Sequence, residues 1–161
     1  MKKLYIIRHA KSSWEDFSSN DFDRDLSKRG KLNAPFMGDR LRKTGVEPDI
    51  IVSSPALRAR ITAEIIAKKI KFSKKITLKK KIYEASFKTL RKIVTELPDD
   101  VKIVFLFGHN PGLNEFAQKY IDFYENIPTC GIVEIEFDCE TWMEVDEKNA
   151  KLIMFDYPKK H

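Results

Sequence analysis

Three segments of this sequence end in residue types that bind and transfer phosphoryl groups. Arg8 and His9 close one apolar run, Arg58 follows Ser54 by four positions, and His109 comes directly after another apolar run and a glycine. Arginine presents a planar fork of donors that matches phosphoryl oxygens. A neutral histidine carries a nitrogen lone pair that can attack phosphorus. Brought together, two arginines and two histidines would form a site for a dianion.

Each of these residues also has a structural explanation when it is considered alone. A single histidine after a strand more often makes structural hydrogen bonds than performs catalysis. An arginine in the first turn of a helix is usually a surface charge. The functional interpretation rests on placement, because His9 and His109 both follow apolar runs while the third histidine, His161, is the last residue.

The apolar runs themselves are predicted strands. Residues 2–9 are β-branched and aromatic up to His9, residues 48–54 form a short buried run, and residues 101–107 are almost wholly apolar, which is typical of a central strand covered on both faces. Residues 10–26 are polar and rich in Asp and Ser, so we expect a loop there. Three predicted strands therefore end in or close to residues that can bind or transfer a phosphoryl group.

Helices are predicted between the strands. One helix should follow Ser27 and end at Gly45, with Pro35 kinking or delaying it. Ser54 and Pro55 have the order expected of an N-cap and a first helical position. Two further helices are expected over residues 87–97 and 113–123.

The remaining runs alternate in polarity and are predicted strands. An edge strand is expected over residues 75–84, and C-terminal strands are expected over residues 132–138, 141–146 and 151–157. This alternation of strands and helices predicts an α/β fold, a three-layer α/β/α arrangement with a mostly parallel central sheet. We expect one domain over residues 1–161. In such sheets the ligand lies beyond the carboxyl ends of the strands.

Charge and composition narrow the function classes. The formal net charge is +6, and the densest lysine stretch covers residues 68–81. That stretch could bind nucleic acid or an acidic partner. It holds one aromatic residue, Phe72, and no known binding module, so a solvated surface is favoured and we expect no nucleic-acid partner. A positive field also favours an anionic substrate.

Several cofactors and locations are not expected from this sequence. Cys130 and Cys139 match neither a disulfide framework nor a metal motif, and no aspartate cluster or phosphate-binding glycine loop indicates magnesium. We therefore expect no metal and no cofactor. The apolar runs are too short to cross a bilayer, and the N-terminus lacks the pattern of a signal peptide. A cytoplasmic monomer without membrane contact is the expectation.

Five motifs in order resemble a known family. They are LYIIRHAKS, RDLSKRG, SSPALRARITAE, IYEAS and LFGHNPG. Together they are similar to the histidine phosphatase superfamily, which has the phosphoglycerate mutase-like fold, and most of all to its small phosphohistidine phosphatases of the SixA type. The resemblance extends over roughly residues 3–155.

The resemblance implies a role for each matching residue. His9 would be the nucleophile that is phosphorylated during turnover, Arg8 and Arg58 would bind the phosphoryl oxygens, and His109 would donate to them. Glu84 falls at the acid/base position of many members. Substrate-side or peripheral positions are Arg24, Ser12 and Asn110.

Two departures from the family pattern refine the expected function. Ala10 replaces the glycine that commonly follows the Arg-His pair, and only 25 positions separate Glu84 from His109. Mutases and sugar-phosphate phosphatases of the family carry a longer insertion there, which covers the pocket. An uncovered site suits a phosphorylated side chain on a protein, whereas mutase activity needs shielding from water.

We therefore expect a metal-independent phosphatase that forms a phosphohistidine on His9 and acts on protein phosphohistidine. A small-molecule phosphomonoesterase of the same fold is one alternative. A non-catalytic phosphate-binding module is another, and the complete set of Arg8, His9, Arg58 and His109 argues against it.

Overall fold

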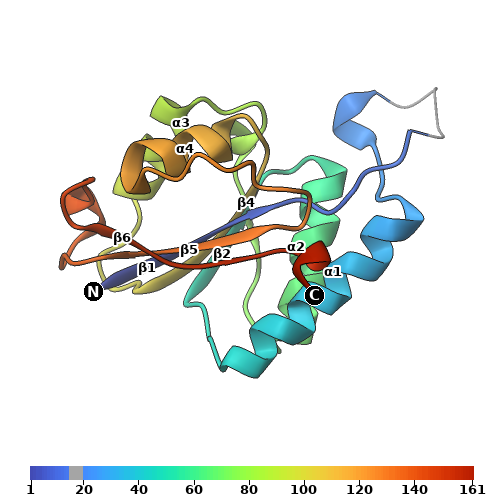
Figure 1. Ribbon diagram of the computed structural model, residues 1–161, viewed down its shortest axis with the longest axis horizontal. Coiled ribbons are helices and arrows are strands. Elements are labelled where there is room, and N and C mark those ends of the chain that lie inside the picture. Colours follow the sequence, from blue (N-terminus) through green and yellow to red (C-terminus); the bar gives the residue numbers. More distant parts are fainter. Residues whose placement is uncertain (15–19) are drawn as a thin grey trace.

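A six-stranded mixed sheet forms the centre of the computed structural model, which describes residues 1–14 and 20–161 (Figure 1). The strands are β1 (Lys2–Arg8), β2 (Ile50–Ser53), β3 (Thr77–Leu78), β4 (Ile103–Gly108), β5 (Ile132–Phe137) and β6 (Ala150–Asp156). They lie in the order β3-β2-β4-β1-β5-β6. The pairs β3-β2, β2-β4 and β4-β1 are parallel, and β5 is antiparallel to both of its neighbours. The predicted mostly parallel α/β sheet is confirmed.

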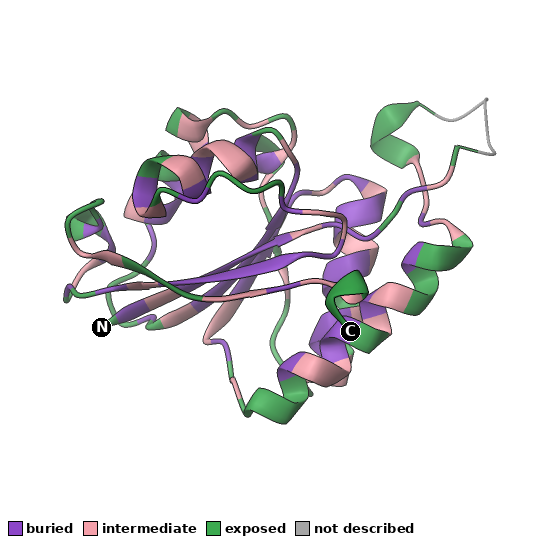
Figure 2. Cartoon of the chain, viewed as in Figure 1, coloured by how far each residue is buried: buried purple, intermediate pink, exposed green. Residues whose placement is uncertain are grey.

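Helices cover both faces of this sheet. They are α1 (Lys28–Thr44), α2 (Leu57–Lys69), α3 (Phe87–Thr95) and α4 (Gly112–Ile121). Alternate residues of β1 point to opposite sides: Leu4 and Ile6 join the core under α3 and α4, whereas Tyr5 and Ile7 join the core under α1 and α2. The central strands β1, β2, β4 and β5 are accordingly buried between the two helical layers, whereas β3 is exposed and β6 is largely exposed (Figure 2). This confirms the three-layer arrangement.

The predicted helix after Ser27 forms with the expected caps. The Ser27 hydroxyl accepts a hydrogen bond from the Gly30 amide at 3.2 Å, and Gly45 closes the helix with a left-handed φ of 78°. Pro35 lies inside α1 and does not delay its start. Local sequence signals are therefore sufficient for this element.

The prediction that Ser54 caps a helix starting at Pro55 is wrong. Helix α2 begins at Leu57 with Ala56 at the N-cap. The Ser54 hydroxyl instead accepts from the Ala56 amide at 3.2 Å, a side-chain turn that places the helix start two residues later. Ser54 is thereby free to contact a residue from another strand.

The predicted strand over residues 141–146 is also wrong. Its centre is the 3-10 helix η3 (Trp142–Glu144), because the Glu144 carboxylate accepts from the Thr141 amide at 3.0 Å and closes a tight turn. Trp142 is fully buried and donates through its indole nitrogen to the Val101 carbonyl at 2.8 Å. The alternating polarity of residues 141–146 therefore arises because Trp142 is buried, and not because the segment pairs as a strand.

Two connecting regions contain short helices that the sequence pattern does not indicate. The predicted edge strand over residues 75–84 pairs only as β3 and continues as η2 (Lys80–Ile82). The predicted loop over residues 10–26 contains η1 (Asp21–Asp23), and its residues 15–19 lie outside the described part. A fourth 3-10 helix, η4 (Pro158–Lys160), follows β6. Among the described residues no helix has the length and apolarity that a membrane crossing requires.

Candidate active site

Three neighbouring strands end at the same edge of the sheet and deliver the residues of the site. β4 lies between β2 and β1, so Ser54, His109 and His9 follow adjacent parallel strands. The His9 amide donates to the Gly108 carbonyl at 3.2 Å, and the two imidazole rings are 5.2 Å apart between centroids. The structure thus brings both predicted site histidines together at the carboxyl ends, as the topology rule requires.

His9 is held with one ring nitrogen free. Its Nδ1 lies 2.7 Å from the Ala10 carbonyl oxygen, which can only accept, so this contact places the ring proton on Nδ1. The Nε2 atom then carries the lone pair, and the Arg58 Nε–H points at it from 3.4 Å. The Ala10 amide donates to the Thr62 hydroxyl on α2 at 2.9 Å, which ties the turn after β1 to that helix.

Burial keeps both histidines neutral. Loss of solvent lowers the pKa of His9 to about 3 against the opposing effect of its hydrogen bond to the Ala10 carbonyl, and the charges of Arg58 and Arg8 lower it further. Burial likewise lowers the pKa of His109 to about 4, and the Arg58 charge adds to this effect. A neutral His9 at physiological pH is what a nitrogen nucleophile requires.

These lowered pKa values predict acid-sensitive folding. Well above pH 6.5 both histidines are neutral in the folded and unfolded chain, so they contribute no pH dependence. Below pH 6.5 the unfolded chain binds protons that the folded one excludes, so the free energy of unfolding falls, by up to about 1.4 kcal/mol per pH unit for each histidine. Urea unfolding at pH 6.5 and pH 5, without phosphate in the buffer, measures this slope. An equal slope in wild type and the His9→Asn/His109→Asn double variant would contradict the assignment.

Arg58 connects His9 to a carboxylate from a distant loop. Its side chain is 8% exposed, its Nη1 donates to the Asp21 backbone oxygen at 2.7 Å, and its Nη2 donates to Asp21 Oδ2 at 3.1 Å. The Tyr83 hydroxyl donates to the same Oδ2 at 2.6 Å. This hydrogen bond, followed by the Arg58 charge, lowers the pKa of Asp21, and it raises the pKa of Tyr83 to about 12.

Buried donors without a hydrogen-bond partner gather around this pair. Of the five buried side-chain nitrogen and oxygen atoms that lack a partner in the described residues, four are Arg8 Nε, Arg24 Nε, Arg24 Nη1 and His109 Nδ1. An unmade buried hydrogen bond is costly, so such atoms need an explanation. Four donors or potential donors on three residues near Arg58 fit an anion with several acceptor oxygens.

Other contacts hold these residues in place. His109 Nε2 and the Ser54 hydroxyl are hydrogen-bonded at 2.8 Å. Arg8 Nη1 donates to the Ile127 carbonyl at 3.0 Å, and Asn110 Nδ2 donates to the same oxygen at 2.9 Å. Asn110 therefore supports the segment that holds Arg8.

The remaining predicted positions are Ser12, Arg24 and Glu84, and of these three only Glu84 is exposed. Arg24 Nη2 donates to the Ser12 hydroxyl, and its guanidinium stacks 3.6 Å above the Trp14 ring. Glu84 is exposed, has a left-handed φ of 57°, and lines a hollow of about 560 Å³ together with Tyr83 and others. Among the described residues no hydrogen bond or ion pair joins Glu84 to the two histidines or the arginines, so its acid/base role stays a prediction.

Asp21, Tyr83, Ser54 and Thr62 are site neighbours whose roles the sequence did not reveal. Thr62 had a usable signal, because it follows Arg58 by four positions and so shares its helix face. Asp21 had none, since it lies in a polar segment without periodicity, 37 positions from its partner Arg58.

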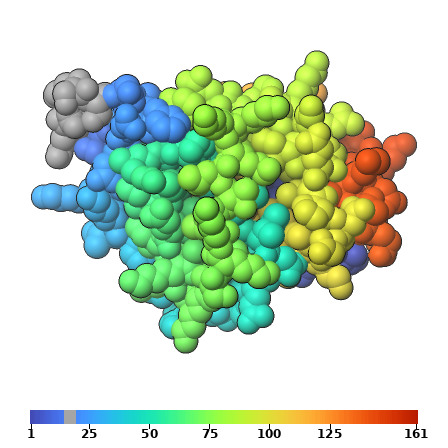
Figure 3. All heavy atoms as spheres, turned by 180° about the vertical axis from the view of Figure 1, so that it is seen from behind, coloured from blue at the N-terminus to red at the C-terminus, as the bar shows by residue number. Residues whose placement is uncertain are grey.

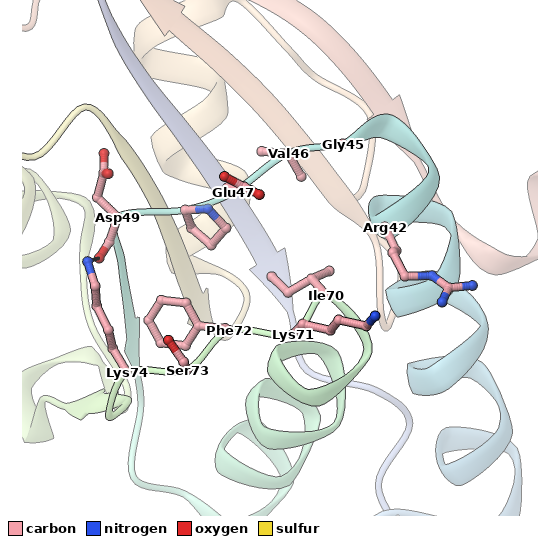
Figure 4. Close-up of a pocket in the computed structure, with 11 residues that line it drawn as sticks. Arg42, Gly45, Val46, Glu47, Asp49, Ile70, Lys71, Phe72, Ser73 and Lys74 are labelled. Atoms are coloured by element: carbon pink, nitrogen blue, oxygen red, sulfur yellow. Dashed lines mark hydrogen bonds between the residues drawn. The ribbon is translucent and has the colours of Figure 1, made fainter.

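A second hollow lies away from this chemistry. It has a volume of about 560 Å³ and is lined by residues 45–49 and 70–74 with Arg42 (Figure 4). Residues 45–49 precede β2, so this hollow is at the amino end of the strand and opposite the site. Lys74 there donates to the Asp49 backbone oxygen at 3.0 Å. No histidine or cysteine lines it.

Comparisons with known proteins agree with this geometry. A family model described as "Histidine phosphatase superfamily (branch 1)" matches residues 4–105. An uncharacterised chloroplastic protein of Arabidopsis thaliana is 27% identical over 152 residues, covering 89% of this chain and 70% of the relative. The mitochondrial serine/threonine-protein phosphatase Pgam5 of Drosophila ananassae is 34% identical over 73 residues, which are 45% of this chain but 25% of that protein.

Solved structures share the whole fold. The putative phosphohistidine phosphatase SixA from Agrobacterium tumefaciens superposes with a TM-score of 0.83 at 27% identity, over 98% of both chains. The protein histidine phosphatase SixA complexed with tungstate gives a TM-score of 0.84 at 18% identity, again over 98% of both chains. Because the tungstate complex is 18% identical, its similarity to this chain concerns the fold alone.

Proposed function

The chain belongs to the histidine phosphatase superfamily and is a phosphatase, and from this premise we propose that His9 is its nucleophile and a protein phosphohistidine its substrate. The observation that carries the proposal is the state of His9. Its Nδ1 is committed to the Ala10 carbonyl, so the lone pair of Nε2 faces Arg58. A neutral nitrogen beside clustered cations is what attack on a phosphoryl dianion requires.

The proposed reaction has two displacements at phosphorus. In the first, the Nε2 lone pair of His9 forms a bond to phosphorus while the bond from phosphorus to the leaving atom breaks, and the leaving atom keeps that electron pair. In the second, a water oxygen attacks phosphorus, the N–P bond breaks, and its electron pair returns to Nε2. Inorganic phosphate leaves, and the two protons of water end on the leaving group and the phosphate or in solvent. Arg8, Arg58 and His109 would stabilise the charge on the three equatorial oxygens.

An imidazole leaving group would make little demand on a general acid such as Glu84. An alkoxide is a poor leaving group and needs a proton during bond cleavage, whereas a protonated imidazole leaves readily. Glu84 is exposed at the rim, and in the described part of the chain it makes no hydrogen bond to the site.

A direct assay separates the candidate activities. The protein is incubated with a phosphohistidine-bearing protein, a sugar phosphate and an aryl phosphate, and release of phosphate is followed with and without EDTA. We expect the highest kcat/KM on the phosphoprotein and no effect of EDTA, because the described residues hold no group of three or more His, Cys, Asp or Glu able to hold a metal. Preference for the sugar phosphate would identify a small-molecule phosphomonoesterase. Inhibition by EDTA would contradict the metal-free mechanism.

The lysine-rich stretch 68–81 supports a protein substrate with an acidic surface. After β3 the chain returns to the site edge, where Lys80 and Lys81 are exposed on η2, three and two residues before Tyr83. Among the described residues only Lys69 of this stretch has an ion-pair partner, Asp39. Segments from residue 60 to residue 90, coloured green, cover much of the face seen from behind (Figure 3). A positive edge beside an uncovered site would steer an acidic phosphoprotein.

Charge reversal tests this contribution. We expect Lys80→Glu/Lys81→Glu to raise the KM for an acidic phosphoprotein about tenfold at low salt, with less effect at high salt, because exposed charges are screened. The KM for a small aryl phosphate should change less than threefold. The matched control is Lys148→Glu/Lys151→Glu, which makes the same charge change at exposed positions near the opposite edge strand, β6. Equal effects of the two pairs would show that only net charge matters.

A cytoplasmic location and a monomeric state stay predictions.

A further inference from the structure

The 3-10 helix η1 places one carboxylate against the arginine that faces the nucleophile. We propose that Asp21 is a positioning residue that orients the Arg58 guanidinium toward a phosphoryl group on His9, and that Tyr83 holds the Asp21 carboxylate for this task. The inference rests on the proposed function, since it assigns a role within the same site. It concerns a residue that touches Arg58 and does not itself act on phosphorus.

The donors of Arg58 are divided between two partners. A guanidinium has five N–H donors, one on Nε and two on each Nη. Asp21 takes one from Nη1 with its backbone oxygen at 2.7 Å and one from Nη2 with Oδ2 at 3.1 Å. The Nε–H points at His9 Nε2 from 3.4 Å. The Asp21 contacts therefore leave three donors available, one of which already faces the attacking atom.

Asp21 is itself held in place by hydrogen bonds to its backbone oxygen and to its carboxylate. Its backbone oxygen also accepts from the Arg24 amide at 3.2 Å, and Tyr83 donates to Oδ2 at 2.6 Å. The Tyr83 ring packs edge-on against Phe22 of η1 at 5.2 Å and against His109 at 5.6 Å. An aromatic side chain thus connects the loop that carries Asp21 to a histidine of the site. A pre-oriented donor loses less entropy when the transition state forms.

Two other roles for Asp21 are less consistent with these contacts. A carboxylate that blocks the anion site would occupy the Arg58 donor that faces His9, but Asp21 binds the Nη atoms and leaves the Nε–H directed at Nε2. A general acid would need a proton to donate. The Tyr83 hydrogen bond and the Arg58 charge lower the pKa of Asp21, so its carboxyl group stays ionised.

The contribution of Asp21 to stability can be separated from its contribution to the rate. Its side chain is 51% exposed, but that of Arg58 is 8% exposed, so loss of the carboxylate leaves a buried donor without its acceptor. Asp21→Asn keeps an acceptor oxygen for that donor. The melting temperature of each variant, measured beside kcat, distinguishes a positioning role from a loss of folded protein.

The test compares Asp21→Ala with Asp21→Asn, which remove the same charge, because Asn keeps an acceptor oxygen for Arg58. With an aryl phosphate we expect Asp21→Ala to lower kcat about tenfold or more, and Asp21→Asn to lower it less than threefold. The matched control Asp23→Ala, an exposed carboxylate on the same η1 turn, should leave kcat unchanged. Equal kcat in Ala and Asn variants, or a kcat in Asp21→Ala at or above wild type, would overturn the proposal.

A double-variant cycle tests whether Asp21 acts through Arg58. In the Arg58→Ala background, Asp21→Ala should change kcat less than twofold, because its partner is gone. The tenfold effect in the wild-type background should be the same for aryl and alkyl phosphates. An undiminished effect without Arg58 would overturn the proposal, and so would a much larger effect with the poor alkyl leaving group, which would indicate a general acid.

Binding of inorganic phosphate keeps this inference separate from the proposed function. Calorimetry should show at least threefold weaker phosphate binding to Asp21→Ala than to Asp21→Asn, and no such difference in the Arg58→Ala background. If wild type hydrolyses none of the substrates yet this binding difference appears, the proposed activity fails and the positioning role stands. If hydrolysis is observed and the binding difference is absent, the positioning role fails alone.

Discussion

Replacing His9 with alanine is expected to lower kcat/KM for every hydrolysed phosphate compound by about four orders of magnitude or more, as loss of a covalent nucleophile does. His9 is 6% exposed, lies at the end of β1, and presents an unprotonated Nε2 to Arg58. Without His9, water would have to attack the substrate phosphorus directly, in one difficult displacement in place of two easier ones. Steady-state kinetics with an aryl phosphate measure the loss.

The control for this variant is His161→Ala. His161 is the third histidine; its Nε2 contacts Asp156 at the end of β6 at 2.6 Å, and its ring lies 6.1 Å from that of Phe36 on α1. We expect its replacement to leave kcat/KM within twofold of wild type. Rapid denaturation during turnover should trap an acid-labile phosphate on the peptide that contains His9. A phosphate trapped on another residue, or full activity of His9→Ala, would remove His9 from the mechanism.

The second large effect is expected at Arg58, where alanine should lower kcat by about 10²–10³-fold, the range found when one preorganised transition-state donor is deleted. Arg58 is buried, and its Nε–H is the guanidinium donor aimed at the attacking atom. Its loss would also leave Asp21 without its buried cationic partner. Because the donor acts on charge that develops during transfer, kcat should fall more than KM rises.

Arg60→Ala is the matched control for Arg58→Ala. Arg60 lies two positions later on α2, its side chain is 43% exposed, and its ion-pair partner is Glu64 at 4.0 Å. We expect less than a twofold change in kcat. Arg58→Lys should recover little activity, because an ammonium cannot contact Asp21 and the phosphoryl group as a planar fork does. Nearly full activity of Arg58→Lys would mean that charge alone suffices.

Much of the fold follows from local sequence signals. The apolar runs that become β1, β2 and β4 are continuous because both faces of these strands are covered, and Ser27 and Gly45 bound α1 through short-range capping. Signals of this kind depend on neighbours within a few positions. The two wrong predictions concern side chains with a distant or turn-specific partner. Ser54 is hydrogen-bonded to His109 and does not cap a helix, and Trp142 lies buried in a tight turn and not in a strand.

For the site, the apolar runs were enough to predict that Arg8, His9 and His109 lie at the ends of parallel strands, since runs of the right length end at these residues and parallel strands share one carboxyl edge. Which atoms meet there depends on tertiary contacts. The proton position on His9 follows from one carbonyl, and the orientation of Arg58 follows from Asp21 across 37 positions of chain. Such contacts leave no periodic trace in a sequence, because they depend on where a polar loop packs after the sheet has formed.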